Sequence, residues 1–234
     1  MEKVLDVYTK DGEYLGTRPV TMFSNEELDF YYKTVRVLLL NENNEILIQK
    51  RADNVIYCPG KWEFSASGHV EVGENELDAA IRETKEEIGV SLDKNSIKLI
   101  NISTNKNALA HTFIGRIKNS TKFTLQKEEV SEVKYVSLYD FKNLIYTDDF
   151  VPKEKSYYEF LLDYLVNTLK IDDRNIIKRQ VNGENFSKSM DSINEDDNVK
   201  EGMELDNSLK IIDYVVAVLL MVLVGIVVYC IIKL

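Results

Sequence analysis

The sequence predicts the α+β fold class for a domain that occupies residues 1–171. The chain has 234 residues, which leaves room for one core of ordinary size and for appendages. Several runs rich in β-branched and aromatic residues surround one acidic segment with helical periodicity, and two more helical patterns follow. Strands that surround a single acidic helix indicate an α+β domain.

The predicted strands account for most of this domain. The first run is followed by an Asp-Gly pair at residues 11–12, which is typical of a turn. In the second run, Val35, Val37 and Leu39 alternate with other residues, as expected of a strand buried on at least one face. Polar residues 41–44 join this run to the next as a hairpin. The expected strands lie at residues 2–9, 32–40, 45–49, 62–71, 97–102, 109–117 and 133–136.

Two helical patterns close the domain, and the composition then changes. Residues 138–144 form a short pattern, and residues 153–169 form an amphipathic one. From residue 172 to residue 210 the chain is rich in Asn, Asp, Glu, Lys and Ser and has few aromatic residues. We expect this segment to be a disordered acidic tether.

The last segment of the chain is apolar. Residues 214–232 contain no charge and are bounded by Asp213 and Lys233. At about 1.5 Å per residue, a helix of this length spans close to the ~30 Å hydrocarbon core of a bilayer. We therefore expect residues 211–234 to form a C-terminal transmembrane helix, a tail anchor whose partner is membrane lipid. The alternative is a helix buried in a soluble protein.

The net charge argues against a nucleic-acid-binding protein, and the positions of the two cysteines argue against a disulfide bond. The formal net charge is -10 at pH 7 and no basic cluster offsets it, which argues against a nucleic-acid polymer as partner. Cys58 falls in the predicted domain and Cys230 in the predicted span. A disulfide between them is therefore not expected, and both are interpreted as unpaired thiols.

The acidic helix carries the features that point to chemistry. Glu83, Glu86 and Glu87 stand at i, i+3 and i+4, so they project from one face within a single turn. Such like charges disfavour a helix unless a cation neutralises them, and carboxylate oxygens suit Mg²⁺ or Mn²⁺. The alternative, a solvated acidic face, explains neither Arg82 nor the spacing of the glycines. Asn75 is in position to cap the helix. The residues that recur on another face, and can anchor the helix to a core, are Leu77, Ala80, Ile81, Thr84 and Ile88.

The segment from residue 68 to residue 90 follows a fixed spacing, Gly-x5-Glu-x7-Arg-Glu-U-x-Glu-Glu-x-Gly-U, in which U is aliphatic. The matching residues are Gly68, Glu74, Arg82, Glu83, Glu86, Glu87, Gly89 and Val90. This spacing resembles the Nudix box, the signature of a family that hydrolyses nucleoside diphosphates linked to another group. Thr84 departs from the family pattern, which usually has a bulky aliphatic residue at this position. This difference concerns the packing of the helix rather than its chemistry.

The resemblance implies an α/β/α sandwich with the box helix against a mixed sheet. It also implies Mg²⁺- or Mn²⁺-dependent cleavage of a diphosphate linkage in a nucleoside diphosphate derivative or a related diphosphate. By this resemblance Glu83, Glu86 and Glu87 bind the metal, and the carbonyl of Gly68 is a further ligand. Arg82 orients the glutamates through charge-assisted hydrogen bonds, and Glu83 activates water. A glutamate from a distant loop often completes the site in this family, and the candidates are Glu128, Glu129 and Glu132, of which Glu129 is favoured.

The order of the segments QKRA, PGKWEFSASGH and the acidic helix resembles the branch that includes isopentenyl diphosphate isomerase, over roughly residues 2–165. That isomerase has a cysteine directly before its Gly-His pair, where this chain has Ser67. Its acidic partner is expected in the strand that reads NKNALAHTF here, which contains no carboxylate. A metal-binding histidine is expected near Tyr32, and only His69 matches. Because isomerisation needs groups that add and remove protons, hydrolysis is favoured, and His69 is either a metal ligand or positions the loop.

A third hypothesis is a membrane-tethered module that binds a nucleotide without cleaving it. Such a degenerate domain should have lost box glutamates, whereas all of them are present here.

The box does not specify the rest of the substrate, and the predicted anchor favours a membrane-associated diphosphate such as a prenyl or lipid-linked one. Nucleotides and free Mg²⁺ are cytosolic, and residues 1–16 lack the apolar region of a secretory signal. We therefore expect the catalytic domain in the cytoplasm.

Overall fold

The computed structural model describes residues 2–22 and 28–171. The expected tether at 172–210 and the expected anchor at 211–234 lie outside the described residues. Within the described part, no helix combines the length and the apolar character needed to cross a membrane.

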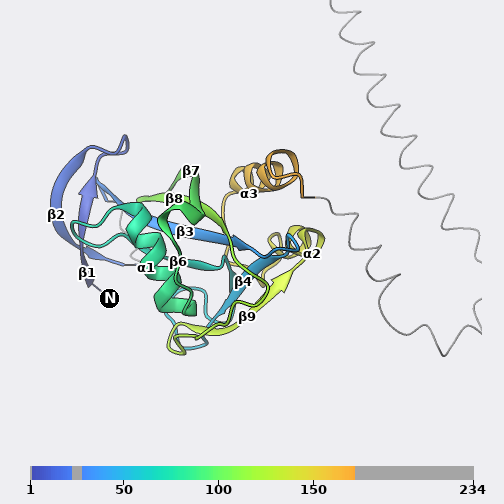
Figure 1. The fold of residues 1–234 in the computed structure, drawn as a ribbon. Coiled ribbons are helices and arrows are strands. Elements are labelled where there is room, and N and C mark those ends of the chain that lie inside the picture. The colour runs from blue at the N-terminus through green and yellow to red at the C-terminus, as the bar shows by residue number, and fades with distance from the viewer. Residues whose placement is uncertain (1, 23–27, 172–234) are drawn as a thin grey trace, which may run out of the picture. The chain divides into compact units, whose positions relative to one another are not determined.

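The described residues form nine strands and a small number of helices (Figure 1). Each predicted strand and helix is present close to its predicted position, with the exceptions given below. The strands are β1 (Glu2–Tyr8), β2 (Tyr14–Thr21), β3 (Tyr31–Leu40), β4 (Ile46–Arg51), β5 (Trp62–Glu63), β6 (Ala66–His69), β7 (Ile97–Asn105), β8 (Ala108–Arg116) and β9 (Val130–Val136). The helices are α1 (Glu76–Ile88), the 3-10 turn η1 (Lys94–Ser96), α2 (Leu138–Leu144), α3 (Lys155–Asp163) and the π-helical turn η2 (Tyr164–Thr168).

The sheet is mixed, as predicted, and β3 lies at its centre. β3 runs parallel to β8, with Tyr32 opposite Ala108 and Leu40 opposite Arg116. It runs antiparallel to β1, β4 and β6. The β7–β8 hairpin extends the sheet on one side of β3, and β9 pairs with β4 on the other. The α+β fold class is therefore confirmed.

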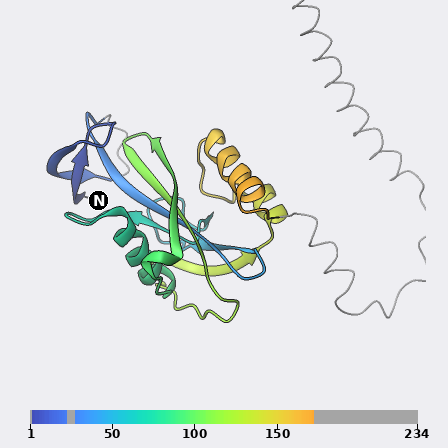
Figure 2. The ribbon, with the colours of Figure 1, turned by 45° about the horizontal axis from the view of Figure 1, so that its top comes forward.

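Helices cover both faces of this sheet. On β3, Val35, Val37 and Leu39 belong to a core cluster that includes the buried residues of α1. The intervening Leu38 and Leu40 belong to a second cluster with residues of α2 and α3. The period of two in a strand therefore sends alternate side chains to opposite layers. Figure 2 shows α1 and α3 on opposite sides of the central strands. These layers form the α/β/α arrangement that the resemblance implies.

The central strands β3 and β4 separate soon after they pair. Their only paired positions in the described structure are Leu39 with Leu47 and Leu40 with Ile46. At this point the buried hydroxyl of Ser65 accepts a hydrogen bond from the Leu39 amide at 2.8 Å and donates one to the Leu47 carbonyl at 2.6 Å. The chain crosses the gap here, because β5 pairs with β4 and β6 pairs with β3. A continuous strand at 62–71 was therefore the wrong prediction.

Two other elements differ from the prediction. β2 was not predicted, because most of its residues are exposed and Val20 is the one position that is buried, so the run shows no apolar alternation. The predicted helix at 153–169 is divided into α3 and the π-helical turn η2.

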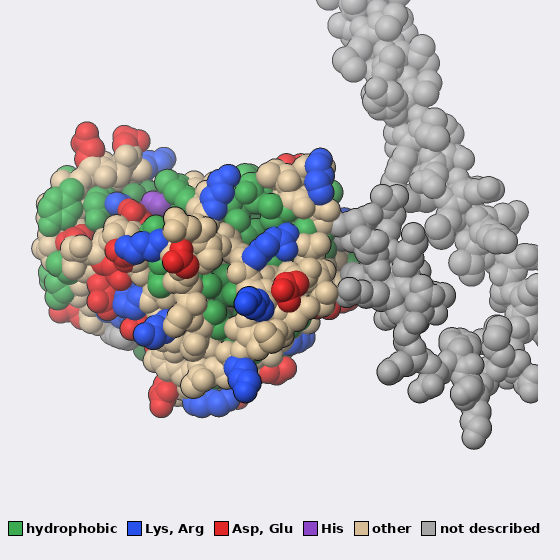
Figure 3. All heavy atoms as spheres, in the orientation of Figure 1, with side chains coloured by type: hydrophobic (Ala, Val, Ile, Leu, Met, Phe, Trp, Pro, Cys, Tyr) green, Lys and Arg blue, Asp and Glu red, His purple; other side chains and the backbone are tan. Residues whose placement is uncertain are grey.

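On the face shown in Figure 3, acidic and basic side chains are interspersed, and no broad basic area is visible there.

Candidate functional site

Helix α1 presents the acidic residues, and its ends are fixed by local interactions. The side chain of Asn75 accepts a hydrogen bond from the Asp78 amide at 3.0 Å, so Asn75 caps the helix as predicted. Gly89 ends it in the left-handed region, with φ of 74°. Thr84 is fully buried, and its hydroxyl donates to the Ala80 carbonyl at 2.7 Å. Thr84 therefore packs in the core with its polar group satisfied.

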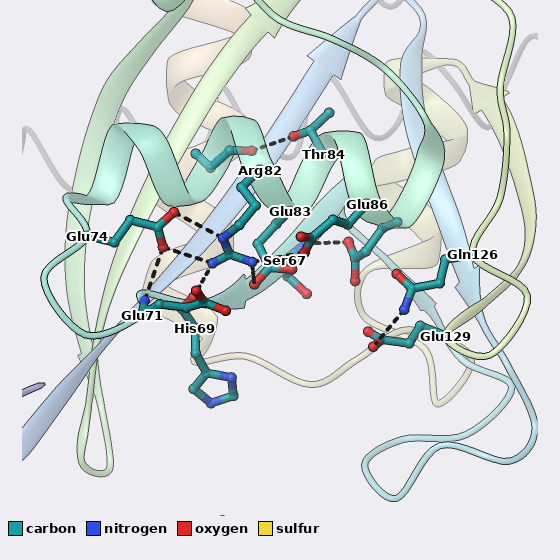
Figure 4. Close-up of polar contacts among 12 residues, drawn as sticks. Ser67, His69, Glu71, Glu74, Arg82, Glu83, Thr84, Glu86, Gln126 and Glu129 are labelled. Atoms are coloured by element: carbon teal, nitrogen blue, oxygen red, sulfur yellow. Dashed lines mark hydrogen bonds and ion pairs between the residues drawn. The ribbon is translucent and has the colours of Figure 1, made fainter. Parts of the chain in front are cut away.

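Arg82 joins the parts of the acidic segment (Figure 4). Its Nε and Nη2 atoms donate to the two carboxylate oxygens of Glu74 at 3.0 and 2.9 Å. Its Nη1 atom lies 2.9 Å from Glu83 Oε1 and 3.0 Å from Glu86 Oε2. Nη2 also donates to the His69 carbonyl at 2.9 Å. One guanidinium thus ties the helix to the loop before it and to the end of β6 through charge-assisted contacts.

Glu83 lies against the backbone of β6. A Cβ added to Gly68 would overlap the Cδ and Oε1 atoms of Glu83, so the carboxylate occupies the space that glycine leaves. The Glu83 side chain is only 14% exposed. Burial raises the pKa of this carboxyl group to about 7, while the Arg82 guanidinium opposes the rise. Negative charge at this position is therefore costly in the absence of a further cation.

Glu87 is buried more deeply than Glu83. It is 2% exposed, and its Oε2 atom accepts hydrogen bonds from the Ser67 amide at 2.9 Å and from Gln49 Nε2 at 3.0 Å. Burial raises its pKa well above the ordinary value, and the two hydrogen bonds oppose this shift. The buried Oε1 atom of Gln49 has no hydrogen-bond partner in the described structure. The contacts of Gln49 and of the Ser67 amide were not predicted from the sequence.

The side chains of Glu83, Glu86 and Glu87 do not all contact the same partners in the structure. Glu83 and Glu86 converge on Arg82, whereas Glu87 faces Ser67 and Gln49. Across residues 2–22 and 28–171, no group of three or more His, Cys, Asp or Glu side chains is close enough to hold a metal ion. The donor set nevertheless fits a hard divalent cation, because it consists of carboxylate oxygens whose charge is only partly compensated. Metal binding by these residues stays a prediction.

The loop that carries Glu129 is fixed to both sides of this region. The Gln126 amide donates to the Glu87 carbonyl at 3.0 Å, and the Ala52 amide donates to the Glu129 carbonyl at 2.8 Å. The charge of Glu129 also contributes to the raised pKa of Glu83. Glu128 and Glu129 both line the groove described below. Glu132 instead lies on β9 opposite Lys50, and it is not among the lining residues.

The side chain of His69 lies apart from the glutamates. Its ring points away from Arg82 and the carboxylates (Figure 4), and it lies 5.7 Å from the Tyr32 ring between centroids. Burial, together with Lys3 and Arg82, lowers the pKa of His69 to about 4, so the ring is neutral at pH 7. Its backbone carbonyl holds Arg82, which fits the interpretation that His69 positions the loop.

These residues open onto one groove. Its volume is about 1370 Å³, and it extends from the acidic helix to the gap between β3 and β4. Its lining includes Ser67, Gly68, His69, Arg82, Glu83, Glu86, Glu87, Glu128 and Glu129. A groove with carboxylates on one wall and room for a substrate of moderate size suits the binding of an anionic compound through a bridging cation.

Comparisons with known proteins agree with this geometry. The model of the NUDIX domain family matches residues 31–160, which is more than half of the chain. Nudix hydrolase 3 of Arabidopsis thaliana is 33% identical over 162 residues, but the match covers 63% of this chain and only 21% of that protein. A prenyl-diphosphate phosphatase of Methanosarcina mazei is 30% identical over 132 residues, covering 55% of this chain and 75% of that protein. An isopentenyl-diphosphate Delta-isomerase of Cutibacterium acnes is 29% identical over 90 residues, covering 38% of this chain and 45% of that protein.

The fold has a counterpart of known structure. A crystal structure of a Deinococcus radiodurans protein superposes with a TM-score of 0.56, covering 70% of this chain and 97% of that one. The sequence identity is 16%, so this likeness shows the fold alone. The family match and the hydrolase relatives carry the identification. The chain belongs to the NUDIX domain family.

Proposed function

We propose that this chain is a Mg²⁺- or Mn²⁺-dependent hydrolase that cleaves a diphosphate linkage in a nucleoside diphosphate derivative or a related diphosphate. The observation that carries the proposal is the pair Glu83 and Glu87, a half-buried and a buried carboxylate with raised pKa values on one wall of a large groove. Burying two carboxylates side by side is unfavourable unless they serve a cation.

The residues of the chain divide the work of hydrolysis. Glu83, Glu86 and Glu87 would hold the cation, together with the Gly68 carbonyl and, from the loop, Glu129. When bound, the cation supplies charge neutralisation of the diphosphate and a lowered pKa for coordinated water. Glu83, which lines the groove beside Glu86 and Glu87, is the carboxylate placed to accept a proton from the attacking water. Arg82 keeps Glu83 and Glu86 in place through its two short contacts.

Isomerisation of isopentenyl diphosphate is the competing function, since several relatives bear that name. Ser67 occupies the position before Gly68 and lines the groove, and a serine hydroxyl is a poor proton donor to an alkene. The strand residues 105–113 contain no carboxylate that could work from the opposite side. Hydrolysis needs neither group, so the residues present support hydrolysis.

A substrate panel tests this proposal. The full chain with Mg²⁺ should hydrolyse at least one of a set of nucleoside, sugar and prenyl diphosphates, with the products separated from the substrate by anion-exchange chromatography. Isopentenyl diphosphate in deuterated water should yield no dimethylallyl product. Deuterium incorporated into an allylic product would overturn the assignment in favour of isomerisation. Tight nucleotide binding without any turnover would favour a non-catalytic binding module.

We also propose that residues 214–232 attach the chain to a membrane with the catalytic domain in the cytoplasm. The support is the uncharged run itself, which is long enough for a bilayer core. The full chain should stay in the membrane fraction after alkaline carbonate washing, and truncation after Ile171 should give a soluble and active domain. An insoluble or inactive truncated chain would show that the tail belongs to the domain.

A further inference from the structure

A second group of charges lies where β3 and β4 separate, and the proposed reaction does not use it. Arg36 comes from β3, Arg51 from the end of β4, Glu63 from β5 and Lys153 from the segment before α3. Arg51 Nη1 lies 2.9 Å from Glu63 Oε2, and Lys153 Nζ lies 3.5 Å from Glu63 Oε1. We call these four residues the cation cluster, because three cations face one carboxylate.

Three members of the cation cluster are almost completely removed from water, and the fourth, Arg51, has a side chain that is 17% exposed. Arg36 is 7% exposed, and the side chains of Lys153 and Glu63 are 7% and 5% exposed. Burial lowers the pKa of Lys153, with Glu63 opposing the shift and Arg36 adding to it. Buried charges of one sign are unfavourable unless an opposite charge accompanies them. Glu63 cannot compensate all three cations.

Arg36 is the cation without an ionic partner. In the described part of the chain, no carboxylate oxygen lies within 4.0 Å of its guanidinium nitrogens. Its guanidinium donates to the Ser103 hydroxyl at 3.4 Å, and it also contacts Tyr157 through a side-chain hydrogen bond, with its Cζ atom 4.9 Å from the centroid of that ring. A guanidinium presents several donors in a fixed plane, which matches phosphate and carboxylate groups.

A ligand can reach the cation cluster. All four residues line the groove that also contains Glu83 and Glu87. Arg36 and Lys153 additionally line an adjoining cavity of about 230 Å³, whose other polar residues are Asn101, Ser103, Thr104, Asn105, Glu154 and Ser156. The cluster thus lies between the groove and a second space large enough for a phosphate or carboxylate group.

We propose that Arg36, Arg51 and Lys153 bind a second anionic group of the substrate, a phosphate or carboxylate distinct from the diphosphate that is cleaved. This inference rests on the proposed function, because it places both groups of one substrate in the same groove. The residues then determine specificity by favouring compounds that carry such a group. Glu63 fixes the positions of Arg51 and Lys153, and Arg36 supplies a guanidinium that no carboxylate of the described residues engages.

Binding of inorganic phosphate to the full chain in detergent, in the presence of EDTA, tests the cluster directly. Removing divalent cations prevents phosphate from binding through the glutamates, so the result does not depend on whether the chain is a hydrolase. Titration calorimetry should show saturable binding, which Arg36→Met and Lys153→Met should each weaken at least about tenfold. Arg36→Lys keeps the charge but loses the planar set of donors, so it should weaken binding less than Arg36→Met does. Arg116→Met is the matched control, because Arg116 lines neither cavity, and it should bind like the unmodified chain.

Equal weakening by Arg116→Met, or undiminished binding in both cluster variants that melt cooperatively, would overturn the proposal. A second measurement identifies the source of the anion. Phosphate should compete with the hydrolysed compound of the panel in the unmodified chain, and Arg36→Met should require a higher phosphate concentration for the same rise in KM. Inhibition that lowers kcat without raising KM would show a separate regulatory anion site and overturn the assignment to substrate.

Discussion

Replacing Glu87 by Gln is expected to reduce Mg²⁺-dependent turnover by at least about a hundredfold, the loss typical of removing key catalytic electrostatics. Glutamine keeps the volume of the side chain, and its amide oxygen can still accept the hydrogen bonds from Ser67 and Gln49. What it loses is the negative charge that would hold the cation. Turnover of a panel substrate and Mg²⁺ affinity by calorimetry measure the effect.

The melting temperature of Glu87→Gln distinguishes loss of the negative charge from loss of the folded state. Because burial already disfavours the charged form of Glu87, the neutral amide should leave the metal-free melting temperature unchanged or raise it. Glu159→Gln is the matched control, since Glu159 is exposed on α3 and its ion pair within residues 2–22 and 28–171 is with Lys155. It should leave turnover within about twofold. Near-normal Mg²⁺-dependent turnover in Glu87→Gln would contradict the assignment of the metal site.

The sequence could predict those features of the site that depend on helix α1 alone. Glu83, Glu86 and Glu87 share a face because of the helical period, and Asn75 caps the helix because its partner amide is three residues away. These relations are local. They hold wherever the helix packs, so spacing alone predicts them.

The remaining features depend on segments that are distant in the sequence. Gln49 reaches Glu87 only because β4 passes beside α1, and nothing around residue 49 signals this contact. Arg36 and Lys153 meet because β3 and β4 separate, with Ser65 replacing backbone pairing at the gap. A hydroxyl that bridges two strands cannot be distinguished in sequence from a hydroxyl on a loop. The cation cluster therefore required the three-dimensional arrangement.

Replacing Gly68 by Ala is expected to reduce turnover by about a hundredfold or more while leaving the fold nearly unchanged. The new methyl group would overlap the Glu83 carboxylate, which is the end of a flexible side chain and can turn away at little cost. The paired position opposite Val35 remains available to alanine, because Gly68 does not adopt a left-handed conformation. Melting temperature should change little, whereas displacing a catalytic group by about 1 Å can cost a hundredfold in rate.

A double-mutant cycle shows whether Gly68→Ala acts through Glu83. If the methyl group works by displacing this carboxylate, then adding Glu83→Gln should cost little more than the larger of the two single effects, because both variants remove the same interaction. Turnover of the two single variants and the double variant, with one panel substrate and saturating Mg²⁺, gives the coupling. If the reduction in turnover of the double variant equals the product of the two single reductions, then Gly68 contributes independently of Glu83. The explanation based on the close approach of Gly68 to Glu83 would then be wrong. Strong coupling would place the Glu83 carboxylate at the centre of the reaction, held between the backbone of β6 and the guanidinium of Arg82.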